Sequence, residues 1–129
     1  MDEITILQAE ILKTLASPRR LELLHRLSEG PRSVGSLAAE VGLSQPNVSQ
    51  HLAVLRAAGL VETERDGREI RYRLADPDVI VACGVMRSVL ERRLRRLGRL
   101  AEVDPRSTAA TTDRPIALSD PASQLEVLR

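Results

Sequence analysis

The apolar residues of this chain change their spacing near Val61, and this change constrains the fold more than any other feature. Before Val61, leucine, isoleucine and valine recur every three or four residues, which is the spacing of amphipathic helices. After it, apolar and charged residues alternate on both sides of Asp66-Gly67, a pair typical of tight β-hairpin turns. The sequence therefore predicts several helices followed by a two-stranded ribbon.

Capping residues divide the helical part into four segments, the first expected over residues 3–16. Ser17, Ser33 and Ser44 each stand where a further helix can begin, because a serine side chain can accept a hydrogen bond from the first turn. Glycines at 30, 42 and 59 are expected to end these helices. The residues predicted to face the core are Ile4, Leu7, Ile11 and Leu15; Leu21, Leu24 and Leu27 or Ser28; Val34, Leu37 and Val41; and Val48, Leu52 and Leu55.

The ribbon is expected to have one apolar face, which carries Ile70, Tyr72 and Leu74. Its simplest register puts Glu62 opposite Arg71, which is favourable. The same register puts Glu64 opposite Glu69, which is not, so the register stays open.

A last long helix is expected from Asp76-Pro77-Asp78 to about Leu100. Its apolar stripe is wide enough to serve both its own domain and a partner. From residue 104 the periodicity disappears, and Pro, Ser, Thr, Ala and Asp dominate. We therefore predict a mainly α fold with a small β-ribbon (α+β), in which residues 1–103 form one domain and 104–129 a disordered tail.

Composition limits the functions that this chain can have. Its single cysteine, Cys83, excludes an intrachain disulfide and any multi-cysteine metal site within one chain. No paired nucleophile and base, glycine-rich phosphate loop or carboxylate dyad is present, so an enzyme is not expected. No apolar run reaches the ~20 residues of a membrane span, and the acidic N-terminus is unlike a signal peptide. A cytoplasmic protein without membrane contact is the resulting expectation.

Basic residues gather in the middle of the chain. Residues 65–99 carry ten basic and five acidic residues, whereas acidic residues outnumber basic ones on either side. Eighteen of the nineteen basic residues are arginine, whose guanidinium suits bidentate contacts to phosphates and bases. This distribution favours an anionic partner.

The order helix, helix, short turn, helix and ribbon predicts a winged helix-turn-helix. The turn at Gly42-Leu43-Ser44 would set two helices at a steep angle, so that the second can enter a major groove. We expect that helix to present its polar side chains to double-stranded DNA and the ribbon to present arginines. The candidate DNA-binding residues are Ser44, Gln45, Asn47, Ser49, Gln50, His51, Arg65, Arg68 and Arg71.

Gln50 can read adenine in a bidentate manner. Two other candidates have competing interpretations. His51 lies beside the inward face, where it can be a half-buried structural residue or a donor to a phosphate. Arg71 can contact DNA or pair with Glu62. His25, among the leucines of the second helix, is interpreted as flanking the core.

The stretch Leu43-Ser44-Gln45-Pro46-Asn47-Val48-Ser49-Gln50-His51-Leu52, together with the ribbon motif Arg65-Asp66-Gly67-Arg68, resembles the arsenical-resistance (ArsR) family of bacterial winged-helix regulators. The likeness runs from about Ile11 to Leu90. The resemblance implies a homodimer formed through the first and last helices. It also implies an operator with two half-sites and repression relieved by an effector.

The metal ligands that the resemblance implies are incomplete here. Ser33 and Gly35 occupy the positions of a Cys-x-Cys motif found in metal-sensing members. Asp76 and Asp78 match half of a second site, but Val89 and Arg92 fill its other half. No metal residue is therefore assigned, although a metal ion stays open as a cofactor. Cys83 is interpreted as a buried, inert thiol, with a symmetric redox contact across a dimer as the alternative.

The leading hypothesis is a sequence-specific DNA-binding transcriptional regulator. It is expected to be a homodimeric repressor modulated by a metal, a redox change or a small molecule. The alternative is a winged-helix protein-interaction module that does not bind DNA specifically.

Overall fold

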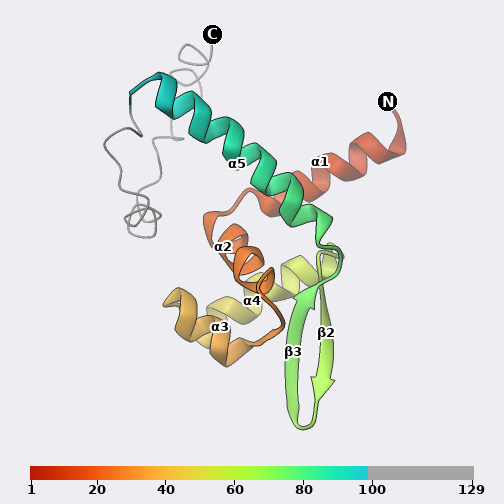
Figure 1. Cartoon of the computed structure of the whole chain (residues 1–129). Helices are drawn as coiled ribbons and strands as arrows, with labels where there is room; N and C mark the ends of the chain where they lie inside the picture. Colours follow the sequence, from red (N-terminus) through yellow and green to blue (C-terminus); the bar gives the residue numbers. More distant parts are fainter. Residues whose placement is uncertain (99–129) are drawn as a thin grey trace. The chain divides into compact units, whose positions relative to one another are not determined.

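The computed structural model describes residues 1–98 of the 129-residue chain (Figure 1). Residues Met1–Ala82 form one compact unit, and the described residues from Cys83 to Gly98 belong to a second unit. The elements in chain order are α1 (Glu3–Leu15), α2 (Pro18–Leu27), β1 (Arg32–Ser33), α3 (Val34–Val41), α4 (Gln45–Ala57), β2 (Val61–Asp66), β3 (Glu69–Leu74) and α5 (Asp78–Arg96). The predicted mainly α fold with a small β-ribbon is confirmed.

The three predicted serine caps are all present. Each serine has extended backbone angles and accepts a hydrogen bond from the backbone N–H three residues later. The pairs are Ser17 with Arg20 (3.4 Å), Ser33 with Ser36 (3.1 Å) and Ser44 with Asn47 (3.3 Å). Local sequence therefore decides where α2, α3 and α4 begin.

Two glycines end α3 and α4 as predicted. Gly42 and Gly59 have φ values of 70° and 76°, a left-handed conformation that only glycine adopts without strain. After α4, the N–H groups of Gly59 and Leu60 donate to the carbonyls of Arg56 and Leu55, both at 2.9 Å. This double closure turns the chain sharply from α4 into β2.

The core of the first unit is built mainly from leucine. Its fully buried side chains are Leu23, Leu24, Leu37, Val48, Leu52, Leu55 and Val61. The predicted inward residues of α4 are confirmed. In α2, however, Leu23 is buried and Leu21 is 41% exposed. The prediction of Leu21 was wrong because α2 carries two overlapping leucine stripes, and packing against α3 and α4 selects the one with Leu23.

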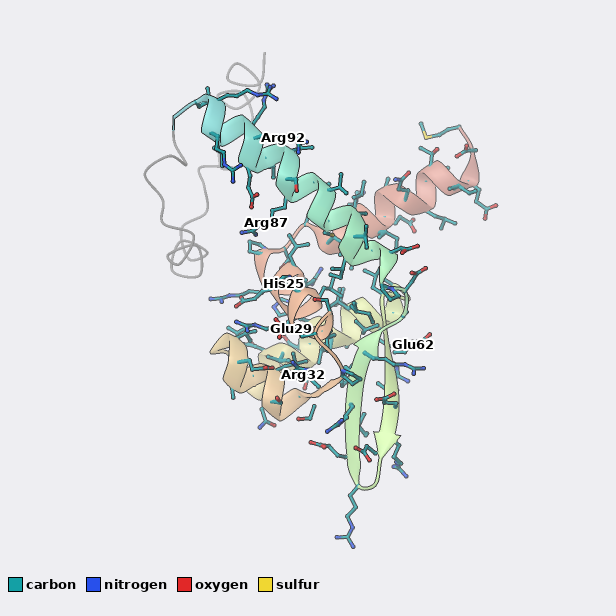
Figure 2. The ribbon with its side chains drawn as sticks, viewed as in Figure 1. His25, Glu29, Arg32, Glu62, Arg87 and Arg92 are labelled. Carbon is teal, nitrogen blue, oxygen red and sulfur yellow. The ribbon has the colours of Figure 1, made fainter. Side chains whose placement is uncertain are left out.

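Two further side chains depart from expectation in this unit. His25 is exposed on the surface of α2 and does not flank the core (Figure 2). The apolar stripe of α1 is also largely exposed. Leu15 is its one buried residue, while Ile4 is 76% exposed. Most of the apolar stripe of α1 is therefore left uncovered within this unit.

The sheet has three strands, one more than the sequence predicted. The order is β1-β3-β2, and β1 pairs antiparallel with β3 through Arg32 opposite Tyr72 and Ser33 opposite Arg71. A two-residue strand has no alternating pattern of its own, so sequence periodicity could not reveal it. Through β1 the ribbon is joined directly to the start of α3.

The hairpin register differs from the simple one considered for the sequence. Asp66 pairs with Glu69, so the turn residues are Gly67 and Arg68. Gly67 has φ of 64°, while Arg68 keeps a negative φ, the pattern of a type II′ turn with glycine first. Glu62 consequently lies opposite Arg73, and Glu64 opposite Arg71. The conflict between Glu64 and Glu69 disappears.

Helix α5 begins at Asp78, close to prediction, but ends at Arg96, earlier than Leu100. Gly98 has φ of 72° and follows the helix end. None of the α5 side chains is buried in the single chain. The predicted tail at 104–129 lies outside the described residues. Among residues 1–98, no helix combines the length and the apolar character needed to cross a membrane.

Candidate nucleic-acid interface

Helices α3 and α4 form the helix-turn-helix, and α4 has two sharply different faces. Val48, Leu52 and Leu55 are fully buried on one face. The polar residues at the start of α4 and on its other face are exposed, namely Ser44, Gln45, Asn47, Ser49 and Gln50. The structure therefore brings five of the nine predicted DNA-binding residues onto one exposed surface, hereafter the α4 surface.

The α4 surface is suited to close approach by a nucleic acid. Ala53 and Ala57 continue it toward the end of the helix, and both are exposed and small. The Ser44 side chain is engaged as the helix cap, so its hydroxyl oxygen already accepts from Asn47. The amides of Gln45, Asn47 and Gln50 can donate and accept hydrogen bonds at base edges.

The ribbon formed by β2 and β3 is the wing, and its tip carries Arg65 and Arg68. Both arginines are exposed, and neither makes an ion pair with the residues that the structure describes. Arg65 lies opposite Ile70, which is 51% exposed. Two unpaired guanidinium groups at an exposed tip can contact phosphates or enter a minor groove.

One face of the wing carries more carboxylates than arginines. Arg73 pairs with Glu62 at 3.1 Å and with Glu64 at 3.4 Å (Glu62 is labelled in Figure 2). Arg71 lies 3.7 Å from Asp66 and 3.6 Å from Glu69. The proposed pairing of Arg71 with Glu62 was therefore wrong, since the register gives Glu62 to Arg73.

Four carboxylates and two arginines share this face, so it carries a net negative charge. These exposed pairs contribute little to stability. They nevertheless weaken the attraction of Arg71 for a phosphate, because two carboxylates already lie beside its guanidinium. Among the predicted arginines, the tip pair is thus better suited to DNA than Arg71.

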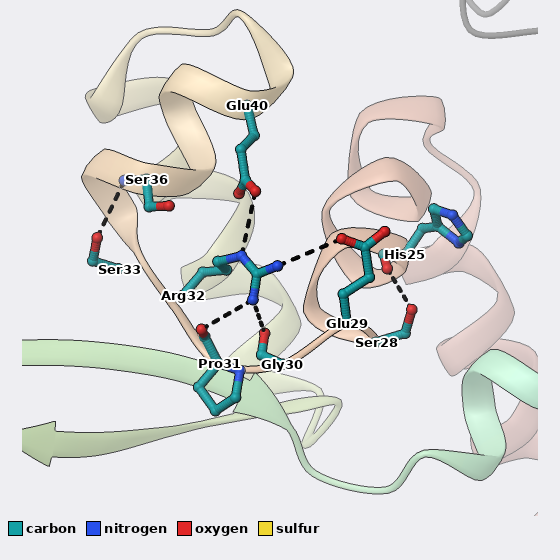
Figure 3. A network of polar contacts seen from close by, with 9 residues as sticks. All are labelled: His25, Ser28, Glu29, Gly30, Pro31, Arg32, Ser33, Ser36 and Glu40. Carbon is teal, nitrogen blue, oxygen red and sulfur yellow. Dashed lines mark hydrogen bonds and ion pairs between the residues drawn. The ribbon is translucent and has the colours of Figure 1, made fainter.

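Arg32 connects the helix-turn-helix to the wing (Figure 3). Its guanidinium bonds the side chains of Glu29 and Glu40 at 3.5 and 3.3 Å. It also donates to the carbonyls of Gly30 and Pro31 at 2.9 and 3.2 Å. Because Arg32 also belongs to β1, it holds the end of α2, the wing and α3 in one arrangement.

His51 contacts α2 through a hydrogen bond that the sequence did not predict. Arg20 Nε donates to His51 Nδ1 at 3.3 Å. Burial, together with the positive charges of Arg20 and Arg19, lowers the pKa of His51 below its usual value. His51 is half-buried, so the interpretation of a half-buried residue beside the core is consistent with the structure.

The structure bears on the possible metal ligands and on Cys83. Within residues 1–98, no group of three or more His, Cys, Asp or Glu is placed to hold a metal ion. Asp76 accepts a hydrogen bond from the N–H of Asp78 at 2.9 Å, as a carboxylate at a helix start does. Cys83 is free and half-buried in the single chain, not fully buried as expected for an inert thiol.

Sequence reasoning missed Arg20 and Arg32 as positioning residues. Each acts across elements that are distant in sequence, since Arg20 and His51 are 31 residues apart. An arginine on an amphipathic helix has no local signal that distinguishes a partner on another element from solvent.

Known proteins resemble this chain in the region that contains the α4 surface. The model of the bacterial regulatory protein arsR family matches residues 17–63, from the cap of α2 into β2. The HTH-type transcriptional regulator Rv0081 of Mycobacterium tuberculosis is 48% identical over 89 residues, which cover 68% of this chain and 78% of the relative. This chain belongs to the ArsR family. It is therefore a winged-helix DNA-binding transcriptional regulator.

Solved structures and a further relative agree with this assignment. The crystal structure of Rv0081 has a TM-score of 0.67 and 44% identity, covering 74% of this chain and 97% of that one. The homodimeric winged helix-turn-helix DNA-binding domain Mb0332 of Mycobacterium bovis has a TM-score of 0.65 and 33% identity, covering 70% and 84%. The biofilm growth-associated repressor of Agrobacterium fabrum is 52% identical over 68 residues, or 53% of this chain and 58% of the relative.

The lowered pKa of His51 predicts a pH dependence of stability. An unfolded histidine titrates near its ordinary value of about 6.5, whereas the folded state resists protonation. The free energy of unfolding should therefore be highest above pH 7 and should fall as the pH drops through 6.5 toward the lowered folded pKa. Urea unfolding between pH 8 and 5 should show a smaller loss for His51→Gln than for wild type. Equal losses would contradict this prediction, because the carboxylates that also titrate are common to both proteins.

Proposed function

We propose that this ArsR-family chain is a homodimeric repressor that binds operator DNA with α4 in the major groove and the wing tip on the backbone. The observation that carries the proposal is the division of α4 into a fully buried apolar face and an exposed polar one. The proposed contacts are Ser44, Gln45, Asn47, Ser49, Gln50 and His51 on α4, and Arg65, Arg68 and Arg71 on the wing. Among these, Arg71 has the weakest case because of its carboxylate neighbours.

Exposed apolar side chains on α1 support a second copy as a partner. Ile4, Ile6, Leu7 and Leu12 are all 49% exposed or more in the single chain. A groove between α1 and α4 is lined by Leu7, Ile11 and Val54, and it continues this apolar surface. A large exposed apolar patch on a small protein typically marks an interaction site.

Helix α5 has the same property. Its large exposed apolar residues are Val81, Val85, Met86, Val89, Leu90 and Leu97, and charged residues such as Arg92 occupy its remaining surface (Figure 2). We propose that α1 and α5 form the dimer interface. A two-fold dimer would then place two α4 helices on successive half-sites of an operator.

The relatives support repression as the regulatory outcome, since one is named a biofilm growth-associated repressor and another a transcriptional repressor. The signal that would release the DNA belongs to one of three classes: a redox change, a small molecule, or a metal ion bound with ligands from two chains. The alternative is a protein-interaction module without specific DNA binding. It would give the exposed side-chain amides of α4 no base edges with which to form hydrogen bonds.

The first test addresses sequence reading. Gln50→Ala should cost roughly 1–3 kcal/mol of operator binding and should relax the preference at one base position, because a bidentate contact is lost. Fluorescence anisotropy on the operator and on single-base variants measures both effects. His25→Ala, a change at an exposed side chain on α2, serves as a control. Unchanged selectivity for Gln50→Ala would contradict the proposed docking.

Arg68→Ala tests the wing tip. Loss of one phosphate contact should weaken binding to all sequences alike and should reduce the slope of log affinity against log salt by about one. Arg71→Ala should have a smaller effect, since Asp66 and Glu69 already neutralise its guanidinium. A slope unchanged by Arg68→Ala would remove the wing tip from the interface.

The dimer is tested on α5. Leu90→Glu places a charge in the centre of the apolar stripe, where Leu90 is 50% exposed in the single chain. Sedimentation equilibrium should show this variant shifted to monomer, with operator affinity reduced. Arg92→Glu introduces the same side chain on the charged remainder of the α5 surface and should leave the dimer intact. If both variants stay dimeric, α5 is not the interface.

A further inference from the structure

Arg20 on α2 forms hydrogen bonds to two other helices, α1 and α4. On α2, its Nη1 donates to the carbonyl of Thr14 near the end of α1 at 3.1 Å. Its Nε donates to Nδ1 of His51, in the middle of α4, at 3.3 Å. Both contacts are partly buried, and together they hold the guanidinium in one orientation. The position of the His51 ring is therefore tied to α2 as well as to α4.

The direction of this bond determines where the His51 proton lies. An arginine Nε can only donate, so Nδ1 must be the acceptor and carries no proton. The neutral ring then has its proton on Nε2. No buried side-chain nitrogen or oxygen lacks a partner among the described residues, and no described residue bonds Nε2, so this N–H is open to solvent.

The charges around His51 favour an anion as the partner of that N–H. The charged groups that act on the ring are Arg20 and Arg19, both on α2. The carboxylate of Glu22 in this region lies 3.4 Å from Arg19. His51 follows Ser49 and Gln50 along α4, beside the α4 surface. An N–H donor next to two guanidinium groups suits a phosphate oxygen.

We propose that Arg20 is a positioning residue that holds His51 in its Nε2–H form, so that His51 donates to a phosphate of the operator. The proposal rests on the proposed DNA-binding function and adds a residue that lies on another helix. Arg20 acts through His51, and its own guanidinium is used within the protein.

A matched pair of variants separates the bond from the charge. In Arg20→Gln the side-chain amide nitrogen stands the same number of bonds from Cα as arginine Nε, so a donor to Nδ1 is kept while the charge is lost. In Arg20→Met both are lost. The two variants share the loss of the bond to Thr14. Arg19→Met removes a charge from the neighbouring position and leaves the bond to His51 intact.

The first measurement is made on the free protein without DNA. Two-bond ¹H–¹⁵N spectra of the histidine rings report which nitrogen is protonated, and the exposed His25 is an internal reference. Wild type, Arg20→Gln and Arg19→Met should show His51 protonated at Nε2 at pH 8, and Arg20→Met should show a mixture of both neutral forms. The pKa of His51 should rise in all three variants, because each removes a positive charge. The proposal would be overturned if His51 in Arg20→Met were protonated at Nε2 to the same extent as in wild type.

The second measurement, made in two backgrounds, is the affinity for a labelled DNA fragment from upstream of the gene that encodes this chain. With His51 present, Arg20→Gln should bind roughly 2–5-fold more tightly than Arg20→Met, because only the Nε2–H share of the mixed ring population can donate to the phosphate. With His51→Phe, which keeps a ring but removes the donor, the two Arg20 variants should bind equally. An equal difference in both backgrounds, or none in either, would overturn the action of Arg20 through His51.

The two proposals fail in distinguishable ways. Wild-type protein without selective DNA binding would overturn the proposed function and the phosphate contact with it. The ring spectra would still show whether Arg20 holds His51 in the Nε2–H form. Thermal unfolding of every variant checks that the comparison is made between folded proteins.

Discussion

The burial of one face of α4 is the constraint on which the rest of the structure depends. Val48, Leu52 and Leu55 are completely removed from solvent, and each fully buried side chain of this kind contributes about 2 kcal/mol. This packing fixes the rotation of α4 about its axis. The polar residues between those apolar positions must then face outward, so the core and the exposed α4 surface are two consequences of the same contacts.

Arginines complete the arrangement, and their partners decide their roles. Arg32 is held by Glu29, Glu40 and two backbone carbonyls, and it joins the wing to α3. Arg20 joins α2 to α4 through His51. Arg68 at the wing tip has no ion pair among the described residues. Its guanidinium is therefore available for the phosphate contact that we propose.

Much of the fold could be predicted because its signals are local. The caps at Ser17, Ser33 and Ser44 and the stops at Gly42 and Gly59 each act within one turn of helix, and all were confirmed. The hairpin was also predicted, but its register was not. A shift of one residue in the turn, from Asp66-Gly67 to Gly67-Arg68, changes every cross-strand pair, and the alternating pattern alone is compatible with both.

The sequence by itself determined the order of the helices and the hairpin, the serine caps, the glycine stops of α3 and α4, and the face of α4 that packs inward, because these depend on residues no more than a few positions apart. Only the tertiary structure decided which leucines of α2 are buried, that Arg32 and Ser33 form a third strand, and that Arg20 reaches His51. Those outcomes depend on which surfaces meet in space. An isolated helix carries several acceptable stripes and several free arginines, and only packing against its neighbours selects among them.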